Sequence, residues 1–226
     1  MKTIGIVGGI GPESTIDYYR LLVAAGHSKI IINSVAVQAL LGMMTTGDTS
    51  GVAAYLCDAV EVLAKAGADV AIIAANTPHV VFDEVQGRSR IPMVSIVDAV
   101  AQHVKAAGMT TAGLLGTRFT MEGTFYPEVF ARHGISVVAP APADRDYVHG
   151  KYLGEFLNNQ FLPETRAGVL QVIDRMRCDF GVQAVILGGT ELPILLRAEA
   201  HNDVVLLDTT RIHAAAVLQA AGTSAA

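Results

Sequence analysis

Cysteine is scarce in this sequence: only Cys57 and Cys178 occur among its 226 residues. This count argues against a disulfide scaffold and against a metal site built from thiolates. Both cysteines fall inside segments with helical periodicity, away from the ends of the predicted strands. We therefore expect both to be small buried structural thiols rather than reactive groups.

Long apolar runs and an excess of positive charge are also missing. Although 51% of the residues are hydrophobic, no stretch reaches the roughly 18 uninterrupted apolar residues of a membrane-spanning helix. Residues 1–15 lack the apolar core and cleavage site of a signal peptide. The net charge of −5 and the pI of about 5.8 argue against a general nucleic-acid surface. These absences predict a soluble, cytoplasmic protein that binds neither nucleic acid nor membrane.

The sequence does contain a regular alternation of apolar runs and helical segments, which is typical of βαβ units on a parallel sheet. Gly67 marks the end of one predicted helix, as a left-handed stop. In the first part of the chain, strands are predicted at 3–9, 29–37, 70–76 and 91–97, and helices at 12–26, 49–68, 77–88 and 98–108. The second part repeats strand, loop and helix over 110–134, a strand over 135–142, helix, strand and loop over 166–196, and a last strand and helix over 201–222.

The two parts resemble each other, which indicates an internal duplication. We predict an α/β fold with two pseudo-symmetric α/β halves, mostly parallel sheets and an active-site cleft between the halves. Residues 1–100 plus 205–226 form the first predicted half, and residues 101–204 form the second. Ligands of open α/β sheets bind beyond the carboxyl ends of the strands. The loops that should meet in the cleft are Gly8–Gly11, Ala75–His79, Gly116–Thr120 and Gly188–Glu191.

Four motifs resemble, in order, those of the aspartate/glutamate racemase superfamily, and the nearest branch is the aspartate racemase-like proteins. They are "GIVGGIGPEST" (5–15), "ANTPH" (75–79), "LLGTRFT" (114–120) and "LGGTELP" (187–193). The resemblance covers most of the chain and implies an isomerase: a cofactor-independent amino-acid racemase that forms a homodimer. In that family two cysteines, one from each half, flank the substrate α-carbon, and one removes the proton while the other returns a proton to the opposite face.

The chain departs from this family pattern at both catalytic positions. Ala75 stands where the first cysteine is expected, and Gly189 stands where the second is expected. Neither side chain holds a proton, so two-thiol racemisation is not possible as written. Arylmalonate decarboxylases, in the same family, keep one cysteine at the second position, and this chain lacks that one too. Three interpretations stay open: a chain inactivated to trap ligand, a natural member with different chemistry, and a binding protein on a racemase fold.

Two titratable residues remain at the predicted cleft as candidates for proton transfer. His79 lies one turn into the helix that follows Ala75, and its alternative role is that of a structural hydrogen-bonding group. Glu191 lies beside Gly189; it resembles a group that orients the catalytic loop, and burial could raise its pKa enough to make it a general base.

The remaining candidate residues are suited to binding a carboxylate. Their hydroxyl, amide and backbone N–H groups lie where a strand or loop meets a helix, and the alternative role of each is a plain helix cap. These substrate-binding candidates are Gly9, Gly11, Asn76, Thr77, Thr117, Thr120 and Thr190. The Gly-rich stretch is not a dinucleotide fingerprint, because Pro12 and Ser14 break that pattern. We expect no cofactor, and the seven histidines show no metal-ligand spacing.

The substrate is expected to be a small-molecule carboxylate or amino acid. The loop over 38–51 has no basic residue to hold a side-chain carboxylate, and its "LLGMM" stretch favours a softer apolar pocket. Arg118 and Lys151 are the remaining cations. The sequence therefore admits a neutral or aryl-bearing carboxylate. The alternatives to a racemase are a thiol-independent decarboxylase or isomerase and a ligand-binding pseudoenzyme.

Overall fold

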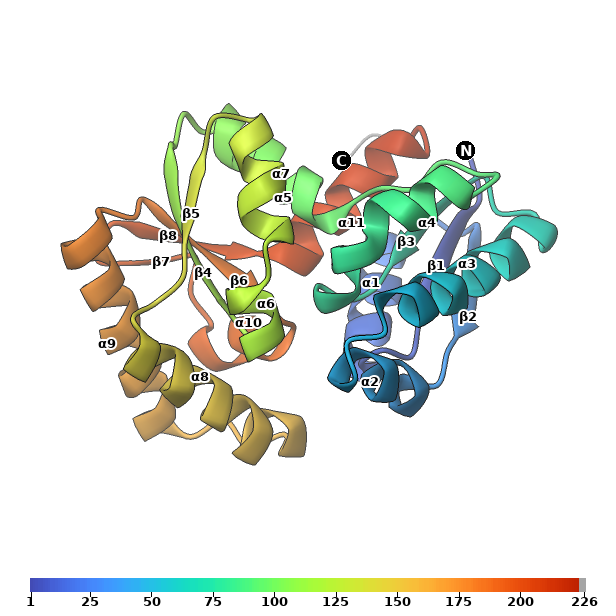
Figure 1. Ribbon diagram of the computed structural model, residues 1–226. Coiled ribbons are helices and arrows are strands. Elements are labelled where there is room, and N and C mark those ends of the chain that lie inside the picture. The colour runs from blue at the N-terminus through green and yellow to red at the C-terminus, as the bar shows by residue number, and fades with distance from the viewer. Residues whose placement is uncertain (224–226) are drawn as a thin grey trace. The chain divides into compact units, whose positions relative to one another are not determined.

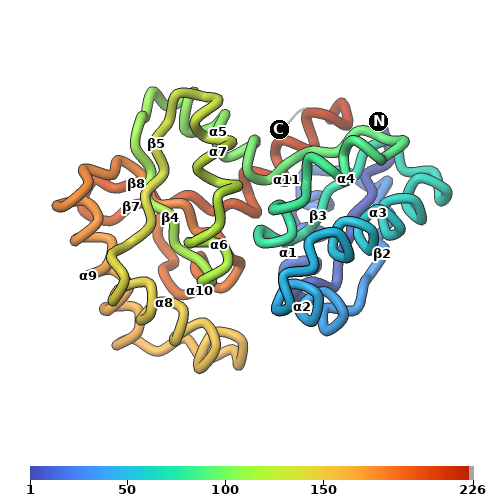
Figure 2. Tube along the Cα trace, in the orientation of Figure 1, coloured from blue at the N-terminus to red at the C-terminus, as the bar shows by residue number. Residues whose placement is uncertain are grey.

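A computed structural model describes residues 1–223 and confirms the α/β class with mostly parallel sheets (Figure 1). The packing of the chain divides it into two units. One unit holds residues 1–99 together with the segment from Thr210 onward, and the other holds residues 100–209. The trace in Figure 2 follows the chain from the first unit into the second and back again for the last helix.

The first unit has a parallel sheet of three strands in the order β2-β1-β3, with β1 in the centre. Its strands are β1 (Ile4–Gly8), β2 (Ile30–Ser34) and β3 (Val70–Ile73). Its helices are α1 (Pro12–Ala24), α2 (Val37–Thr45), α3 (Thr49–Lys65), the 3₁₀ helix η1 (Thr77–Val81), α4 (Phe82–Arg88) and α11 (Thr209–Ala220). Helix α5 (Ile96–Ala106) spans the boundary between the units.

The central strand β1 is buried on both faces, as expected of a parallel sheet covered by helices. Ile4 and Ile6 pack in a cluster with residues of α1 and α11, while Val7 packs with residues of α3. Gly5 faces α3 so closely that a Cβ atom there would lie 3.1 Å from Cδ1 of Leu63 in α3, and 2.9 Å from the Cβ of Ala68 just after that helix. A side chain at position 5 would therefore force α3 away from the sheet.

The second unit has a sheet in the order β5-β4-β6-β8-β7, in which only β7 is antiparallel to its neighbour. Its first three strands follow the same order as in the first unit, with the earliest strand in the centre. The strands are β4 (Thr111–Gly116), β5 (Ser136–Val138), β6 (Ala184–Gly188), β7 (Ala200–His201) and β8 (Val204–Asp208). The helices are α6 (Arg118–Glu122), α7 (Phe125–Arg132), α8 (Pro142–Gly154), η2 (Phe156–Asn158), α9 (Pro163–Phe180) and α10 (Glu191–Leu196).

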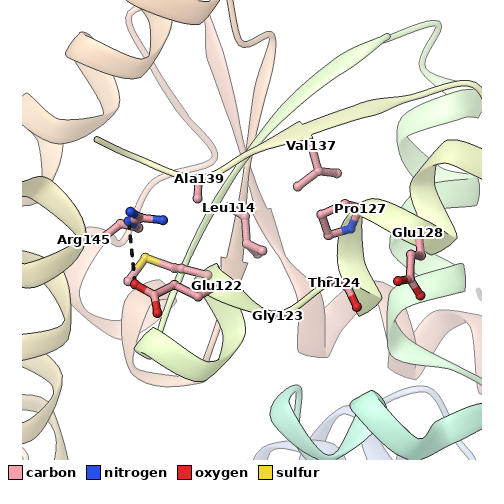
Figure 3. Close-up of a pocket in the computed structure, with 10 residues that line it drawn as sticks. Leu114, Glu122, Gly123, Thr124, Pro127, Glu128, Val137, Ala139 and Arg145 are labelled. Carbon is pink, nitrogen blue, oxygen red and sulfur yellow. Dashed lines mark ion pairs between the residues drawn. The ribbon is translucent and has the colours of Figure 1, made fainter. Parts of the chain in front are cut away.

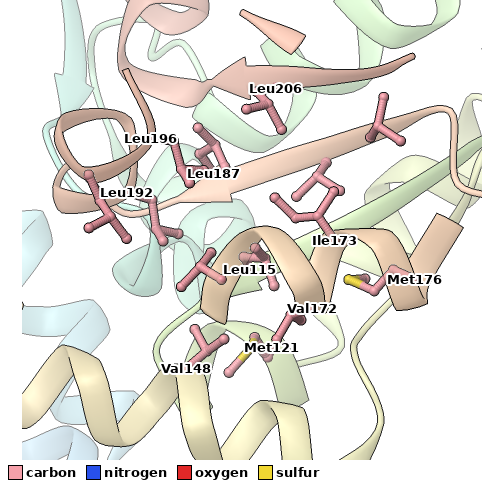
Figure 4. Packing of buried hydrophobic residues seen from close by; sticks show 14 of the residues in the cluster. Leu115, Met121, Val148, Val172, Ile173, Met176, Leu187, Leu192, Leu196 and Leu206 are labelled. Carbon is pink, nitrogen blue, oxygen red and sulfur yellow. The ribbon is translucent and has the colours of Figure 1, made fainter. Parts of the chain in front are cut away.

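The core of the second unit joins α8 and α9 to the sheet, as Figure 4 shows. Val148 of α8 and Ile173 of α9 point toward Leu115 and Leu187, which come from β4 and β6. Burying these side chains fully contributes about 1.5–3 kcal/mol each. The contacts hold α8 beside the sheet, close to the strand ends.

Four segments differ from the sequence predictions. Residues 91–97 do not form a strand: Met93 makes one parallel bridge with Ala71, and α5 begins at Ile96. Pro92 has no N–H to donate to a ladder, which explains why pairing stops there. Helices α2 and α8 were not predicted. Strand β8 pairs with β6, so its residues pack in the second unit, whereas the sequence boundary placed most of them in the first half. The predicted stop at Gly67 is confirmed by its φ of +95°.

Two buried histidines organise the polar interior of the first unit. The Nε2 atom of His79 accepts the N–H of Ile96 at 3.1 Å, so its Nδ1–H donates to the carbonyl of Ala75 at 2.8 Å. His213 donates to the carbonyl of Val94 at 2.8 Å and lies 2.6 Å from the hydroxyl of Tyr18. These partners hold each ring in one neutral tautomer.

Burial lowers the pKa of both rings, to about 3 for His79, where His213 adds a smaller effect, and to about 4 for His213. The unfolded chain therefore binds more protons than the folded chain when the pH lies below about 6.5.

We predict that acid destabilises the protein through this pair. Their contribution is fully present above about pH 7 and is lost as the pH falls from about 6.5 toward 4. At pH 5 each histidine lowers the free energy of unfolding by about 2 kcal/mol. Urea denaturation at pH 7.5 and pH 5 should show a smaller pH effect in His79→Gln. The control is His103→Gln, at an exposed position, which should leave the pH effect unchanged; an equal pH effect in His79→Gln would contradict the prediction.

Candidate functional site

In the first unit, two of the predicted loops lie side by side. Strands β1 and β3 are parallel and in register, so both end at the same edge of the sheet. The hydroxyl of Ser14, in the first turn of α1, donates to the carbonyl of Ala74 at 2.7 Å and joins the two loops. Gly9 and Gly11 of the first loop are thereby placed beside Asn76 and Thr77 of the second.

The two predicted glycines of the first loop have different roles. Gly9 has a φ of +82°, and a Cβ atom there would lie 2.5 Å from the carbonyl oxygen of Val35. Only glycine fits such a position. Its N–H donates to Thr15 Oγ1 at 2.9 Å, so this donor is already used inside the loop. Gly11 has no such constraint, since a Cβ there would meet only Ser14 Cβ at 3.7 Å.

His79 is buried and holds the backbone of the second loop, so its ring is not exposed at the strand end. His79 is 4% exposed, both ring nitrogens have backbone partners, and its ring stacks on Phe82 at 5.1 Å between centroids. This arrangement favours a positioning role, in which His79 fixes the carbonyl of Ala75. Asn76 is 7% exposed, and Ala75 and Thr77 are half-buried.

In the second unit, the loops that follow β4 and β6 also lie side by side. Gly116 and Gly188 are paired in the parallel ladder at the ends of these strands. A Cβ atom on Gly188 would lie 2.8 Å from the carbonyl oxygen of Leu115, so glycine allows the strand ends to approach. Beyond them, the hydroxyls of Thr117 and Thr120 lie 3.3 Å apart.

Gly189 and its neighbours follow β6, which ends at Gly188. Gly189, Thr190 and Glu191 are all half-buried, and Glu191 is the first residue of α10. A Cβ atom on Gly189 would lie 2.1 Å from the hydroxyl oxygen of Tyr152 and 3.0 Å from its Cζ. Position 189 therefore has no room for a side chain while Tyr152 stays in place.

Tyr152 comes from α8 and was missed by the sequence analysis. It is 2% exposed, and its ring lies 5.0 Å from that of Phe156 in a T-shaped contact. Burial, and to a smaller extent the charge of Glu191, raises the pKa of Tyr152 well above its ordinary value. The buried periodicity of Val148 and Tyr152, four residues apart, is a signal for an amphipathic helix, but nothing in it points to β6.

The cations considered for a substrate carboxylate both have acidic partners. Arg118 lies 2.8 Å from Asp146, and Lys151 pairs with Glu155. Neither is a free positive charge at the strand ends.

The expectation for the two cysteines is only partly right. Cys57 is half-buried within α3, and burial raises the pKa of its thiol. Cys178 is exposed, so its prediction as a buried thiol was wrong. Met176 of α9 faces the core, and a residue two positions further along a helix points to the opposite side. Both thiols lie in helices, as predicted.

A cavity of about 540 Å³ lies elsewhere in the second unit, between β4, β5 and α6–α7 (Figure 3). Arg145 and Glu122 face each other at its edge at 3.9 Å, over an apolar floor that includes Leu114 and Val137. None of the predicted site residues lines it. The prediction that the four strand-end loops meet in one cleft stays a prediction.

Residues 1–223 contain no cluster of three or more histidine, cysteine or acidic side chains that could hold a metal ion. In the same part of the chain, no helix is long and apolar enough to cross a lipid bilayer.

Comparisons with known proteins agree with the fold. An Asp/Glu racemase-type protein from Yersinia pestis is 35% identical, with a TM-score of 0.91 over 98% of this chain and 99% of that one. An aspartate racemase homologue from Pyrococcus horikoshii OT3 is 32% identical, with a TM-score of 0.85 over 98% of this chain and all of that one. The broad specificity amino-acid racemase RacX of Bacillus subtilis (strain 168) is 28% identical over 146 residues, which are 60% of this chain and 63% of RacX.

The model of the Asp/Glu/Hydantoin racemase family matches residues 7–217, nearly the whole chain, and so covers all four strand-end loops described above. This chain belongs to the Asp/Glu/Hydantoin racemase family.

Proposed function

We propose that this chain binds a small amino acid or a related carboxylate, without a cofactor, at the carboxyl ends of its parallel strands. One observation carries the proposal: in each unit two neighbouring strands end in paired loops of glycine, threonine and asparagine. Such loops offer hydroxyl and amide donors to a carboxylate. Membership of a racemase family and the similarity to RacX support an amino acid as the ligand.

The reaction cannot be the two-thiol racemisation that the family resemblance implies. Racemisation without a cofactor needs an acid and a base on opposite faces of the α-carbon. Ala75 and Gly189 stand at the positions of the two cysteines and carry no proton. The proposed activity is therefore ligand binding on a racemase fold, as in a pseudoenzyme, unless another group moves the proton.

A second candidate function is a thiol-independent isomerase or decarboxylase. The observation that favours it is the position of Glu191, a half-buried carboxylate at the end of β6 whose charge acts on the hydroxyl of Tyr152. His79 is less suited to proton transfer, because both of its ring nitrogens are engaged. Glu191 is then the base of this second function.

The ligand is proposed to have a neutral or aryl side chain. Arg118 and Lys151 are both paired with acidic residues, which leaves neither of them free for a second carboxylate. We also propose that the protein is cytoplasmic and that it forms a homodimer. Light scattering tests the homodimer, which should have twice the 23.7 kDa mass of one chain.

We predict that the strand-end threonines bind the carboxylate. Thr117→Val and Thr190→Val should each weaken binding roughly 10-fold, because a hydrogen bond to a charged group is lost. Isothermal titration with L- and D-alanine, L- and D-aspartate and phenylmalonate measures this, and aspartate should bind more weakly than the ligands with neutral side chains.

The matched control for these variants is Thr110→Val, an exposed threonine just before β4, at the opposite end of that strand from Thr117. Its affinity should equal that of the parent chain. Unchanged binding in both strand-end variants, beside clear binding by the parent, would place the ligand elsewhere.

We predict that any turnover is independent of thiols and depends on Glu191. NMR in D₂O measures exchange of the α-proton of each amino acid and loss of CO₂ from phenylmalonate. Cys57→Ala/Cys178→Ala should keep the parent's rate, since both thiols lie within helices α3 and α9. Glu191→Gln should reduce the rate by about 100-fold, the size of a general-base contribution. A rate lost in the double cysteine variant would overturn the second function, and no exchange in any variant leaves binding as the function.

A further inference from the structure

The glycine at position 189 is explained by space and not by backbone conformation. Its φ lies outside the left-handed region that favours glycine, in contrast to Gly9 with its φ of +82°. The position where its Cβ would stand is taken by the hydroxyl of Tyr152, 2.1 Å away. The chain thus places a tyrosine hydroxyl where residue 189 would otherwise place its own side chain.

This hydroxyl has no hydrogen-bond partner among residues 1–223, although its oxygen is fully buried. Buried tyrosine hydroxyls normally find a partner, and Tyr18 shows the usual case with its 2.6 Å contact to His213. An unpaired buried hydroxyl is a cost to the folded state that binding of a polar ligand removes.

The ring of Tyr152 fixes the direction of the hydroxyl. It packs in the core of the second unit with Val148 and Phe156, and α8 lies against β4 and α6 (Figures 1 and 2). Burial and the charge of Glu191 raise the pKa of Tyr152, so the hydroxyl keeps its proton at neutral pH. A neutral tyrosine hydroxyl in this position is a hydrogen-bond donor to an oxygen of a ligand.

We propose that Tyr152 is a ligand-binding residue of the strand-end site, whose hydroxyl passes through the space left by Gly189 and donates a hydrogen bond to a carboxylate oxygen of the ligand. The inference rests on the proposed function, in which the ligand is a small amino acid or carboxylate. It adds a donor from α8, a helix in which the sequence analysis named only Lys151 as a candidate cation. It also makes position 189 unable to accept a cysteine unless Tyr152 is changed.

The first experiment compares Tyr152→Phe with the parent chain by isothermal titration, using the ligand among alanine, aspartate and phenylmalonate that the parent binds most tightly. The variant keeps the ring and removes only the hydroxyl. We expect the dissociation constant to rise roughly 10- to 100-fold, the loss expected for a hydrogen bond to a charged group. The melting temperature should stay equal or rise, because the hydroxyl has no partner to lose. Tyr147→Phe, on the same helix and half-buried, is the control and should bind like the parent.

The outcomes separate the two proposals. If the parent binds and Tyr152→Phe binds equally well, or if Tyr152→Phe lowers only the melting temperature, the role of Tyr152 is overturned and the proposed function stands. If the parent binds none of the three ligands, the proposed function fails and the inference falls with it.

A second variant changes position 189 instead of Tyr152 and tests the same contact between them. Gly189→Ala puts a Cβ atom against the hydroxyl and should weaken binding and lower the melting temperature. Adding Tyr152→Phe should restore part of the melting temperature, because it removes the 2.1 Å contact with the hydroxyl and leaves a tight 3.0 Å contact with Cζ, but it should not restore binding. Parent-like binding in Gly189→Ala would show that the hydroxyl and the ligand do not meet.

Discussion

The parallel pairing of β1 with β3 and of β4 with β6 is the constraint on which the candidate site depends. Because these strands are in register, their carboxyl ends stop together, and the loops that follow them are forced into contact. Glycine makes this contact close: Gly116 and Gly188 bring two backbones within reach of each other, and Gly9 turns the chain where no other residue fits. The strand ends are therefore brought together by backbone geometry, with glycine where the backbones come closest.

The polar groups of the two units are used differently. In the first unit, Ser14, Thr15 and His79 all bond to backbone within the unit and hold the loops in shape. In the second unit, the buried hydroxyl of Tyr152 is left without a partner in the described part of the chain. The first set of loops is thus stabilised internally, while the second keeps an unsatisfied donor at the end of a strand. Positions 75 and 189 carry no ionisable side chain, but the hydroxyl of Tyr152 places a polar group beside position 189.

Most strands and the loops after them could be predicted from the sequence. A buried parallel strand has a continuous run of apolar residues, which here ends at a glycine or at a helix cap. The prediction failed mainly where the outcome depended on packing. Residues 91–97 have the composition of a strand, yet Pro92 and the start of α5 leave a single bridge. Cys178 was predicted to be buried although the helical spacing of Val172, Ile173 and Met176 places it on the opposite face of its helix. The meeting of Tyr152 and Gly189, which are far apart in sequence and belong to α8 and β6, follows only from three-dimensional contact.

The bond between His79 and the carbonyl of Ala75 also sets the direction of a peptide plane. The peptide bonds of residues 1–223 are all trans, and in a planar trans peptide the N–H points opposite to the carbonyl. With the carbonyl of Ala75 turned toward the imidazole, the N–H of Asn76 is turned away from it. If this peptide plane were rotated by half a turn, the carbonyl of Ala75 would point where the N–H of Asn76 now points, at the end of β3. His79, with both ring nitrogens bonded to backbone, thus sets which way the carbonyl of Ala75 and the N–H of Asn76 point.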